Sequence, residues 1–232
     1  MPLPKIKQPL FEVEIPSTRK KAKYRPFTVK EEKILLIAQE SKDIDQVVLA
    51  IKQIINNCVV DAKLDDLAMF DLEYLLLKIR AKSVSNEMEF AIKDPDTGEE
   101  IKMSVDIDQI EVVRSEGHTN KIDITGDLTL LMKYPKIDQI QTIAGNKDTQ
   151  ENLFNLMLSC IDSVVEGDEV TKLSDCTEEE IVEFVDGLSS KDVQGLEKFF
   201  ETMPILKFEK EYTRKDGTKK TFVMEGTDTF FI

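Results

Sequence analysis

The stretch RPFTVKEEKILLIAQES, residues 25–41, holds the clearest helix start in the chain. Thr28 and Glu31 have the spacing of a capping box, in which each side chain accepts a hydrogen bond from the other residue's backbone amide. Pro26 precedes them, where an extended backbone suits proline. An apolar face follows: Ile34, Leu35, Ile37 and Ala38. The stretch therefore predicts a helix from about Thr28 to Ser41, with an extended segment before it.

The segment before this helix is basic and rich in proline. Residues 1–30 contain eight Lys/Arg and two Glu, a net +6, so the rest of the chain must carry −20 to give the formal total of −14. Leu10–Ile15 alternates with period two, and Ala22–Phe27 can return as a second strand. We expect a proline-rich arm over residues 1–27 that docks onto an acidic protein surface or onto other copies of the chain. The alternative is a solvated terminus with no binding role.

Two more helices are expected in the first half of the chain. From Asp43 to Ile55 the apolar residues recur at helical spacing, which is typical of a helix packed on a core. Residues 66–83 are apolar around most of the helix circumference in the middle of the segment. We expect this helix to be buried core, with an interface between copies as the alternative.

The pattern then changes to period two, which indicates strands. Five short strands are expected to form a small antiparallel meander: 88–92, 101–107, 110–114, 120–124 and 128–132. Four helices are expected after Pro135: 137–144, 148–164, 177–188 and 189–203. Ile205–Tyr212 and Thr218–Glu225 predict a closing hairpin, because Asp-Gly between two alternating segments is a strong turn signal.

These elements predict an α+β fold. It has a helical core of about six to seven helices, small antiparallel hairpins or a meander, and the N-terminal proline-rich arm. The expected division is 1–27 as the arm, 28–134 as helices plus meander, and 135–232 as a helical part with the C-terminal hairpin. A single compact unit over 28–232 is left open.

Composition argues against several classes of protein. Hydrophobic residues make up 41% of the chain, which is enough for a core, and the pI of about 4.7 argues against nucleic-acid binding over a broad face. We expect no signal peptide and no membrane span, because no apolar run approaches the roughly 18 residues needed. Cys58, Cys160 and Cys176 are widely spaced without a CxxC motif, which favours reduced thiols and a cytoplasmic setting.

Residues that could carry catalysis are few. His118 is the single histidine and lies in a glycine-containing turn without a Ser or Cys signature nearby. Asp106 and Asp108 lack the spacing of known metal motifs. The sequence therefore predicts no catalytic residue, no cofactor and no metal. Two alternatives stay open: a small hydrolase or nuclease using His118 and nearby acids, and an acidic decoy that binds a host protein.

Two stretches resemble a known family. YRPFTVKEEKILLIA, residues 24–38, looks like the N-terminal signature of the baseplate hub assembly proteins of T-even-like contractile-tailed bacteriophages. FDLEYL, residues 70–75, continuing to IRAKS, residues 79–83, looks like the second signature. Tyr134-Pro135 and the closing Gly226 to Phe231 resemble the family less specifically.

The resemblance implies a non-enzymatic role in assembling the central hub of the tail baseplate, as a chaperone-like factor or a hub component. It implies other hub proteins as partners, namely the spike, its collar and the tape-measure protein, while self-association stays open. The implied location is the host cytoplasm during assembly, with the finished virion left open. From the motifs and from exposure we expect these partner-facing residues: Arg25, Phe27, Lys30, Arg80, Lys82, Phe230 and Phe231.

Overall fold

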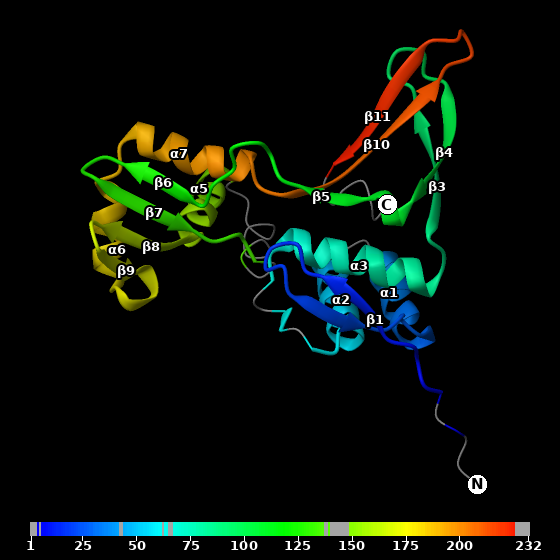
Figure 1. Cartoon of the computed structure of the whole chain (residues 1–232), viewed down its shortest axis with the longest axis horizontal. Coiled ribbons are helices and arrows are strands. Elements are labelled where there is room, and N and C mark those ends of the chain that lie inside the picture. The colour runs from blue at the N-terminus through cyan, green and yellow to red at the C-terminus, as the bar shows by residue number, and fades with distance from the viewer. Residues whose placement is uncertain are drawn as a thin grey trace. The chain divides into compact units, whose positions relative to one another are not determined.

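The structure is a computed structural model that describes residues 4, 6–41, 44–61, 63, 64, 67–136, 139 and 149–225. The chain folds as two compact units (Figure 1). Unit 1 comprises Met1–Val113 and Ile205–Ile232, and unit 2 comprises Arg114–Pro204. This division differs from the expected one, which placed a boundary after residue 134. Unit 2 is inserted into unit 1, so both ends of the chain belong to unit 1.

The helices of unit 1 are α1 (Val29–Ser41), α2 (Ile44–Cys58) and α3 (Met69–Ser83). The apolar side chains of α3 are buried along most of its length: Phe70, Leu72, Leu75, Leu76, Leu77, Ile79 and Ala81. Helix α2 packs against α3 and buries Ile54 and Ile55. Helix α3 is therefore core, as its apolar circumference predicts, and its buried side chains cannot face another copy.

The N-terminal hairpin consists of β1 (Phe11–Glu14) and β2 (Lys21–Tyr24), paired antiparallel. Its inward side chains are buried: Val13, Ile15, Ala22 and Tyr24. Its second strand also pairs beyond the hairpin, because the Val60 amide donates to the Lys23 carbonyl at 2.8 Å. The expected hairpin is confirmed, but residues 11–27 are not a free arm. They belong to the packed body, and Pro4 and residues 6–10 are exposed.

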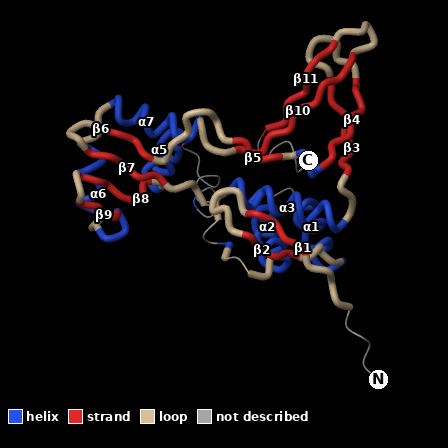
Figure 2. The backbone as a smooth tube through the Cα atoms, in the orientation of Figure 1, coloured by secondary structure: helices blue, strands red, loops and turns tan. Residues whose placement is uncertain are grey.

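Two further hairpins of unit 1 lie side by side (Figure 2). One is β3 (Glu87–Lys93) with β4 (Glu100–Asp106), and the other is β10 (Ile205–Thr213) with β11 (Lys219–Glu225). The 3₁₀ turn η2 (Ile107–Gln109) follows β4 and leads to the short strand β5 (Glu111–Val113). Strand β5 pairs with β10 and so extends the second hairpin into a three-stranded sheet. The rings of Phe90 and Phe222 meet between the two hairpins with centroids 5.4 Å apart.

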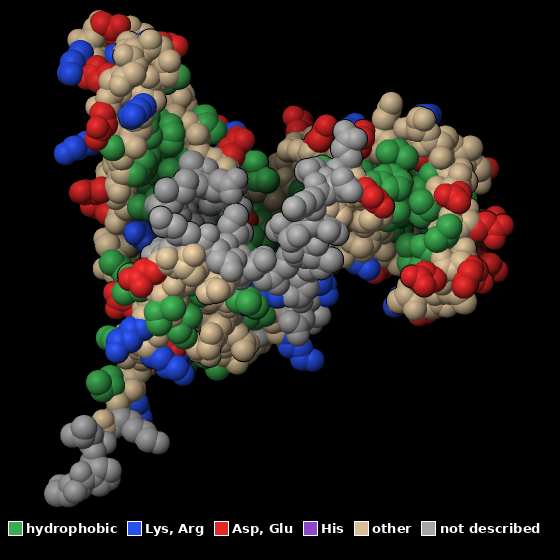
Figure 3. Space-filling model, turned by 180° about the vertical axis from the view of Figure 1, so that it is seen from behind, with side chains coloured by type: hydrophobic (Ala, Val, Ile, Leu, Met, Phe, Trp, Pro, Cys, Tyr) green, Lys and Arg blue, Asp and Glu red, His purple; other side chains and the backbone are tan. Residues whose placement is uncertain are grey.

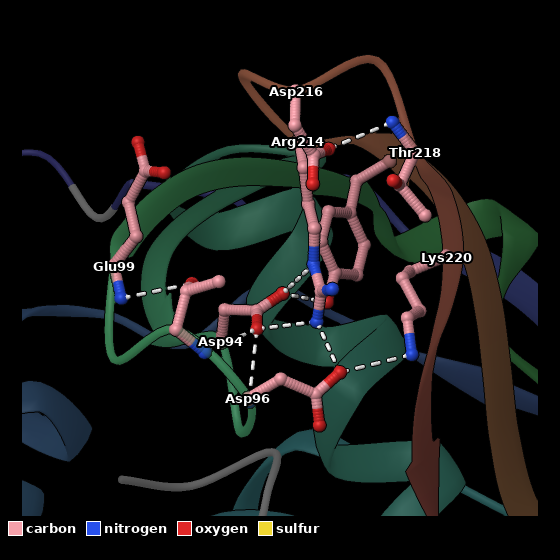
Figure 4. A network of polar contacts seen from close by, with 9 residues as sticks. Asp94, Asp96, Glu99, Arg214, Asp216, Thr218 and Lys220 are labelled. Atoms are coloured by element: carbon pink, nitrogen blue, oxygen red, sulfur yellow. Dashed lines mark hydrogen bonds and ion pairs between the residues drawn. The ribbon is translucent and has the colours of Figure 1, made fainter.

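A network of charged side chains joins the turns of these hairpins (Figure 4). The buried carboxylate of Asp94 accepts hydrogen bonds from Arg214 Nε at 2.7 Å and from the Tyr212 hydroxyl at 2.8 Å. Asp96 accepts from Arg214 Nη2 at 2.6 Å and from Lys220 Nζ at 3.0 Å. The hydrogen bond from Arg214, more than any other contact, holds the pKa of Asp94 well below its usual range. The network fixes one hairpin tip to the other, although the turns are more than 100 residues apart in sequence.

Unit 2 contains one four-stranded antiparallel sheet in the order β6-β7-β8-β9. Its strands are β6 (Lys121–Ile124), β7 (Leu128–Met132), β8 (Ile161–Glu166) and β9 (Glu169–Lys172). Its helices are α5 (Thr149–Ser159), α6 (Glu178–Asp186) and α7 (Ser190–Glu201), with the 3₁₀ turn η3 (Leu173–Asp175) before α6. They enclose a core of buried residues: Ile122, Leu130, Met132, Cys160, Ile161, Leu196 and Phe199.

The expected meander is wrong, because its five strands belong to three different sheets. The expected helix 148–164 is wrong in its last five residues, because α5 ends at Ser159 and the chain becomes β8 from Ile161. Residues 161–163 alternate between buried and exposed, which is the period of a strand. Gly167 does not close a helix but has φ +60° in the β8–β9 turn, a conformation that glycine adopts without steric cost.

Other local expectations are confirmed. The helices expected at 177–188 and 189–203 form as α6 and α7, which begin with the capping boxes Thr177–Glu180 and Ser189–Asp192. The C-terminal hairpin forms as β10–β11. The part of the chain that the structure describes has six α-helices, so the fold is α+β. Most of the helix expected at 137–144 lies outside that part.

Candidate partner-binding surface

A groove in unit 1 brings together the opening stretch of α1, the N-terminal segment and the end of α3. Its volume is about 1010 Å³. The residues that line it are Ile6, Gln8, Arg25, Phe27, Thr28, Val29, Lys30, Glu32, Ser83 and Val84. The side chains of Val29 and Lys30 are exposed at the first turn of α1. Six of the ten lining residues fall between Arg25 and Glu32, within the stretch that predicts the first helix, so this surface is built mainly from that stretch.

An ion pair between the half-buried Arg25 and the buried Glu31 organises one side of the groove. The side chain of Glu31 is 2% exposed and accepts from Arg25 Nη2 at 3.1 Å. The same carboxylate accepts from the Thr28 hydroxyl at 2.6 Å and from the Thr28 amide at 2.9 Å. The Arg25 guanidinium also donates to the Pro26 carbonyl at 2.9 Å. Arg25 therefore holds the entry to α1 in place, and its charge is balanced within the chain.

The protonation of Glu31 depends on these contacts. Burial acts to raise the pKa of Glu31. Hydrogen bonds from Arg25 and from the Thr28 hydroxyl and amide act to lower it, and together their effect is larger than that of burial. They lower the pKa to about 2. The carboxylate is consequently ionised at neutral pH, so the ion pair between Glu31 and Arg25 is present at the start of α1.

Phe27 connects the groove to α3. Its amide donates to Ser83 Oγ at 2.8 Å, and that hydroxyl donates to the Ile79 carbonyl at 2.6 Å. A second link lies in the α3 signature, where Asp71 is buried and accepts from the Ser17 amide and the Ala68 amide, each at 2.9 Å. Both stretches that carry the family resemblance are thus hydrogen-bonded to other parts of unit 1, and the Phe27–Ser83 hydrogen bond joins one stretch to the other.

The structure brings together some of the expected partner-facing residues and separates others. Arg25, Phe27 and Lys30 line the groove. Lys82 is exposed outside it, with Nζ 5.8 Å from the centre of the Phe11 ring. Arg80 is half-buried, and its Nη1 is buried without a hydrogen-bond partner. Phe230 and Phe231 lie outside the described residues. Their role in partner binding stays a prediction.

Sequence reasoning missed part of the groove. Four lining residues lie outside the expected set and outside the opening stretch: Ile6, Gln8, Ser83 and Val84. They meet the opening stretch only because the chain before β1 and the end of α3 come together in space. Ser83 is the last residue of the second signature, and this was the only sign in the sequence that it could belong to a binding surface.

His118 lies in unit 2 and is bound through both ring nitrogens. Nδ1 lies 2.9 Å from Thr202 Oγ1, and Nε2 lies 3.0 Å from the Tyr134 hydroxyl. Thr202 Oγ1 donates to the Lys198 carbonyl at 2.7 Å, so its free lone pair accepts from Nδ1 and the neutral ring fits both partners. Burial, followed by the charge of Arg114, lowers the pKa of His118. The described contacts of the ring are two hydroxyl groups and aromatic rings, with no carboxylate among them.

The described residues contain no group of three or more His, Cys, Asp or Glu side chains arranged to hold a metal ion. Cys58, Cys160 and Cys176 are free thiols. Within the same residues, no helix combines the length and the apolar character needed to cross a membrane.

Comparison with known proteins identifies the family. The family model described as T4 bacteriophage base plate protein matches residues 8–232. No curated protein and no solved structure matches the chain. The match covers nearly the whole chain, including both signature stretches and the groove residues from Gln8 onward. The chain therefore belongs to the T4 bacteriophage base plate protein family.

Proposed function

We propose that this baseplate protein acts without catalysis in assembling the central hub of the tail baseplate, by binding other hub proteins through the groove of unit 1. The observation that carries the proposal is the composition of the groove. Its central part is made of the signature stretch that leads into α1, held rigid by the Arg25–Glu31 pair. A rigid surface loses little conformational entropy on binding a partner.

The groove offers both apolar and charged contacts. Val29 is 65% exposed, and the half-buried ring of Phe27 lies two residues before it. Lys30 and Glu32 add opposite charges on the exposed surface. An apolar contact area with a charged surround is typical of protein-binding sites. The spike, its collar and the tape-measure protein are the candidate partners, in the host cytoplasm during assembly.

The second candidate function is a hydrolase or nuclease that uses His118 and nearby acids, and it would need a carboxylate beside the ring to orient it. Both nitrogens of His118 have hydroxyl partners inside unit 2, so the neutral ring acts as a structural connector. The geometry supports a non-enzymatic role. His118→Ala tests this reading, because an enzyme of that type would lose activity, whereas an assembly protein would keep its function as long as unit 2 stays folded.

Copurification with coexpressed hub proteins tests the proposal. Lys30→Glu and Val29→Asp are expected to reduce recovery of the hub partner about tenfold or more, because each places a charge against the binding surface. Lys33→Glu is the matched control, since Lys33 is exposed on the same helix and does not line the groove. Equal loss in the control, or recovery of host proteins alone, would contradict the proposal and favour the decoy.

A further inference from the structure

A second surface, in unit 2, has a different chemistry. A pocket of about 250 Å³ lies between the sheet strands β7–β9, the turn η3 and helix α6. Its apolar side chains are half-buried: Leu128, Val164, Leu173, Ile181 and Phe184. Val164, Leu173 and Phe184 pack on the core of unit 2 from one side. Their other side faces the pocket, which is therefore apolar inside.

The rim of this pocket is acidic. Glu166, Glu169 and Glu180 line it and are exposed. Residues 162–186 hold ten Asp/Glu and one Lys. Among the described residues no lysine or arginine forms an ion pair with any of the three rim glutamates. Figure 3 shows exposed hydrophobic side chains of unit 2 with acidic side chains beside them.

The rim also contains an unfavourable pairing. Glu166 and Glu169 are direct partners across the β8–β9 hairpin. Like charges at directly opposite positions destabilise a hairpin. Asp168 adds a third carboxylate within the same turn. A cationic group at this position would relieve the repulsion, so the pocket suits an apolar side chain carried next to positive charges.

The N-terminal segment of the chain has this chemistry. Ile6 stands between Lys5 and Lys7 in the sequence. Its side chain is 86% exposed, and Leu10 is 57% exposed. Pro4 and Pro9 favour an extended backbone around it. An exposed branched aliphatic side chain flanked by lysines complements a small apolar pocket rimmed by glutamates in shape and charge.

We propose that the acid-rimmed pocket of unit 2 binds the Pro4–Leu10 segment of a second copy of the chain. Ile6 enters the apolar interior, and the long side chain of Lys7 reaches the rim carboxylates. The contact is heterologous, so two copies that exchange segments form a closed dimer, and one-way exchange forms an open chain. This inference goes beyond the proposed role in hub assembly and does not depend on it.

Sedimentation equilibrium of the purified full-length protein tests the association. The wild-type mass is expected to rise with protein concentration and to fall again at high salt, because exposed charges are screened. Glu169→Lys is expected to weaken association about tenfold. Glu183→Lys makes the same change of charge on an exposed α6 position outside the pocket, and it is expected to behave as the wild type. Mixing Glu169→Lys with Lys7→Glu protein is expected to restore association.

Cys176 provides an independent readout, since it lines the pocket. Cys58 and Cys160 are buried, and burial raises the pKa of each thiol to about 11, so both react slowly with alkylating reagents. A synthetic peptide with the sequence PKIKQPL, residues 4–10, is expected to slow alkylation of Cys176 severalfold. The same peptide with Ile6→Asp keeps both lysines and is expected to give no protection.

The outcomes separate the possibilities. A mass that stays monomeric at every concentration, together with no protection of Cys176 by the peptide, overturns the proposal. Equal protection by the Ile6→Asp peptide shows that charge alone is recognised and also overturns it. Cys176 of the wild-type protein could also be protected equally at every protein concentration. That result would assign the pocket to a segment of the same chain and would overturn the proposal that a second copy fills it. Because Ile6 and Gln8 also line the groove of unit 1, hub binding is tested separately, with Val29→Asp and Lys30→Glu.

Discussion

Units 1 and 2 manage charge in different ways. Unit 1 holds 23 Lys/Arg and 26 Asp/Glu, and all the ion pairs that the structure describes lie within it. Unit 2 holds 8 Lys/Arg and 19 Asp/Glu, a formal net charge of −11 out of −14. Its acids include the helix-capping side chains Glu180 and Asp192, which accept from neutral donors. Unit 1 thus uses charge for internal cohesion, whereas unit 2 leaves most of its negative charge on its surface.

Two capping carboxylates make the comparison concrete. Glu31 caps α1 and also pairs with a guanidinium. Asp192 caps α7, accepting from the Ser189 amide at 2.8 Å and from the Thr125 amide at 3.1 Å. The two residues occupy the same position in their helices. Removal of Glu31 leaves the half-buried Arg25 guanidinium without this partner, whereas Asp192 accepts only from neutral donors, so the loss should be larger in unit 1.

Glu31→Ala is expected to destabilise unit 1 by about 3 kcal/mol, because the half-buried Arg25 guanidinium loses its partner and the helix loses its cap. Hydrogen exchange measured by mass spectrometry separates the units, since peptides from each report local opening. Protection should fall in unit 1 and stay unchanged in unit 2. Glu32→Ala, one residue along and exposed, is the control and should change stability by less than about 0.5 kcal/mol. Equal effects of the two variants would refute the role of the pair.

Acid should also act on unit 1 through Glu31. Its folded pKa of about 2 lies below the ordinary value of 4.5, so its stabilisation is complete above pH 4.5 and is lost as the pH falls towards 2. The contribution is about 3 kcal/mol at most. Urea unfolding of wild-type and Glu31→Gln protein across this range measures it. The difference between the two proteins should shrink on acidification, and a constant difference would contradict the assignment.

Gly195→Ala tests the packing of unit 2. A Cβ at Gly195 would lie 2.7 Å from Ile122 Cγ2, where α7 crosses β6. Alanine normally favours a helix, but this clash is expected to destabilise unit 2 by about 2 kcal/mol. Ile122→Ala in the same chain removes the clashing atom, so the double variant should lose less than the two single losses added together. Additive losses would show that the close contact is not the cause.

Salt is expected to have the smallest effect on stability, and the effect should differ between the two units. Raising the ionic strength screens the repulsion among the surface carboxylates of unit 2 and should stabilise it by roughly 0.5 kcal/mol. Unit 1 should gain nothing, because screening also weakens its ion pairs. Hydrogen exchange at low and high NaCl gives both values from one sample. A stabilisation of unit 1 alone would reverse the comparison.

Much of the local structure could be predicted from the sequence. The capping pair Thr28–Glu31 was recognised, because it depends on residues only three apart. The hairpin around Asp216-Gly217 was recognised for the same reason. Of the groove, the sequence identified Arg25, Phe27 and Lys30, whereas Ile6 and Val84 could not be found without the folded chain.

The errors arose where a pattern fits two structures. Residues 153–164 are apolar enough for a helix, and the switch to β8 at Ile161 follows from pairing with β7 and β9. Short apolar segments do not distinguish a helix from a strand by periodicity alone. The supposed meander failed similarly, because alternation shows that a strand exists but not which strand it joins.

The sequence by itself determined the capped start of α1, the buried character of α3, the hairpins and the uneven distribution of charge. These properties depend on side chains within a few residues of one another or on simple composition. Only the tertiary structure decided that β5 pairs with β10, although the whole of unit 2 lies between these strands in the sequence. It also decided that a groove forms on unit 1 and an acid-rimmed pocket on unit 2. Such contacts join residues far apart in the chain, and their stability depends on the packing of the complete fold rather than on any local pattern.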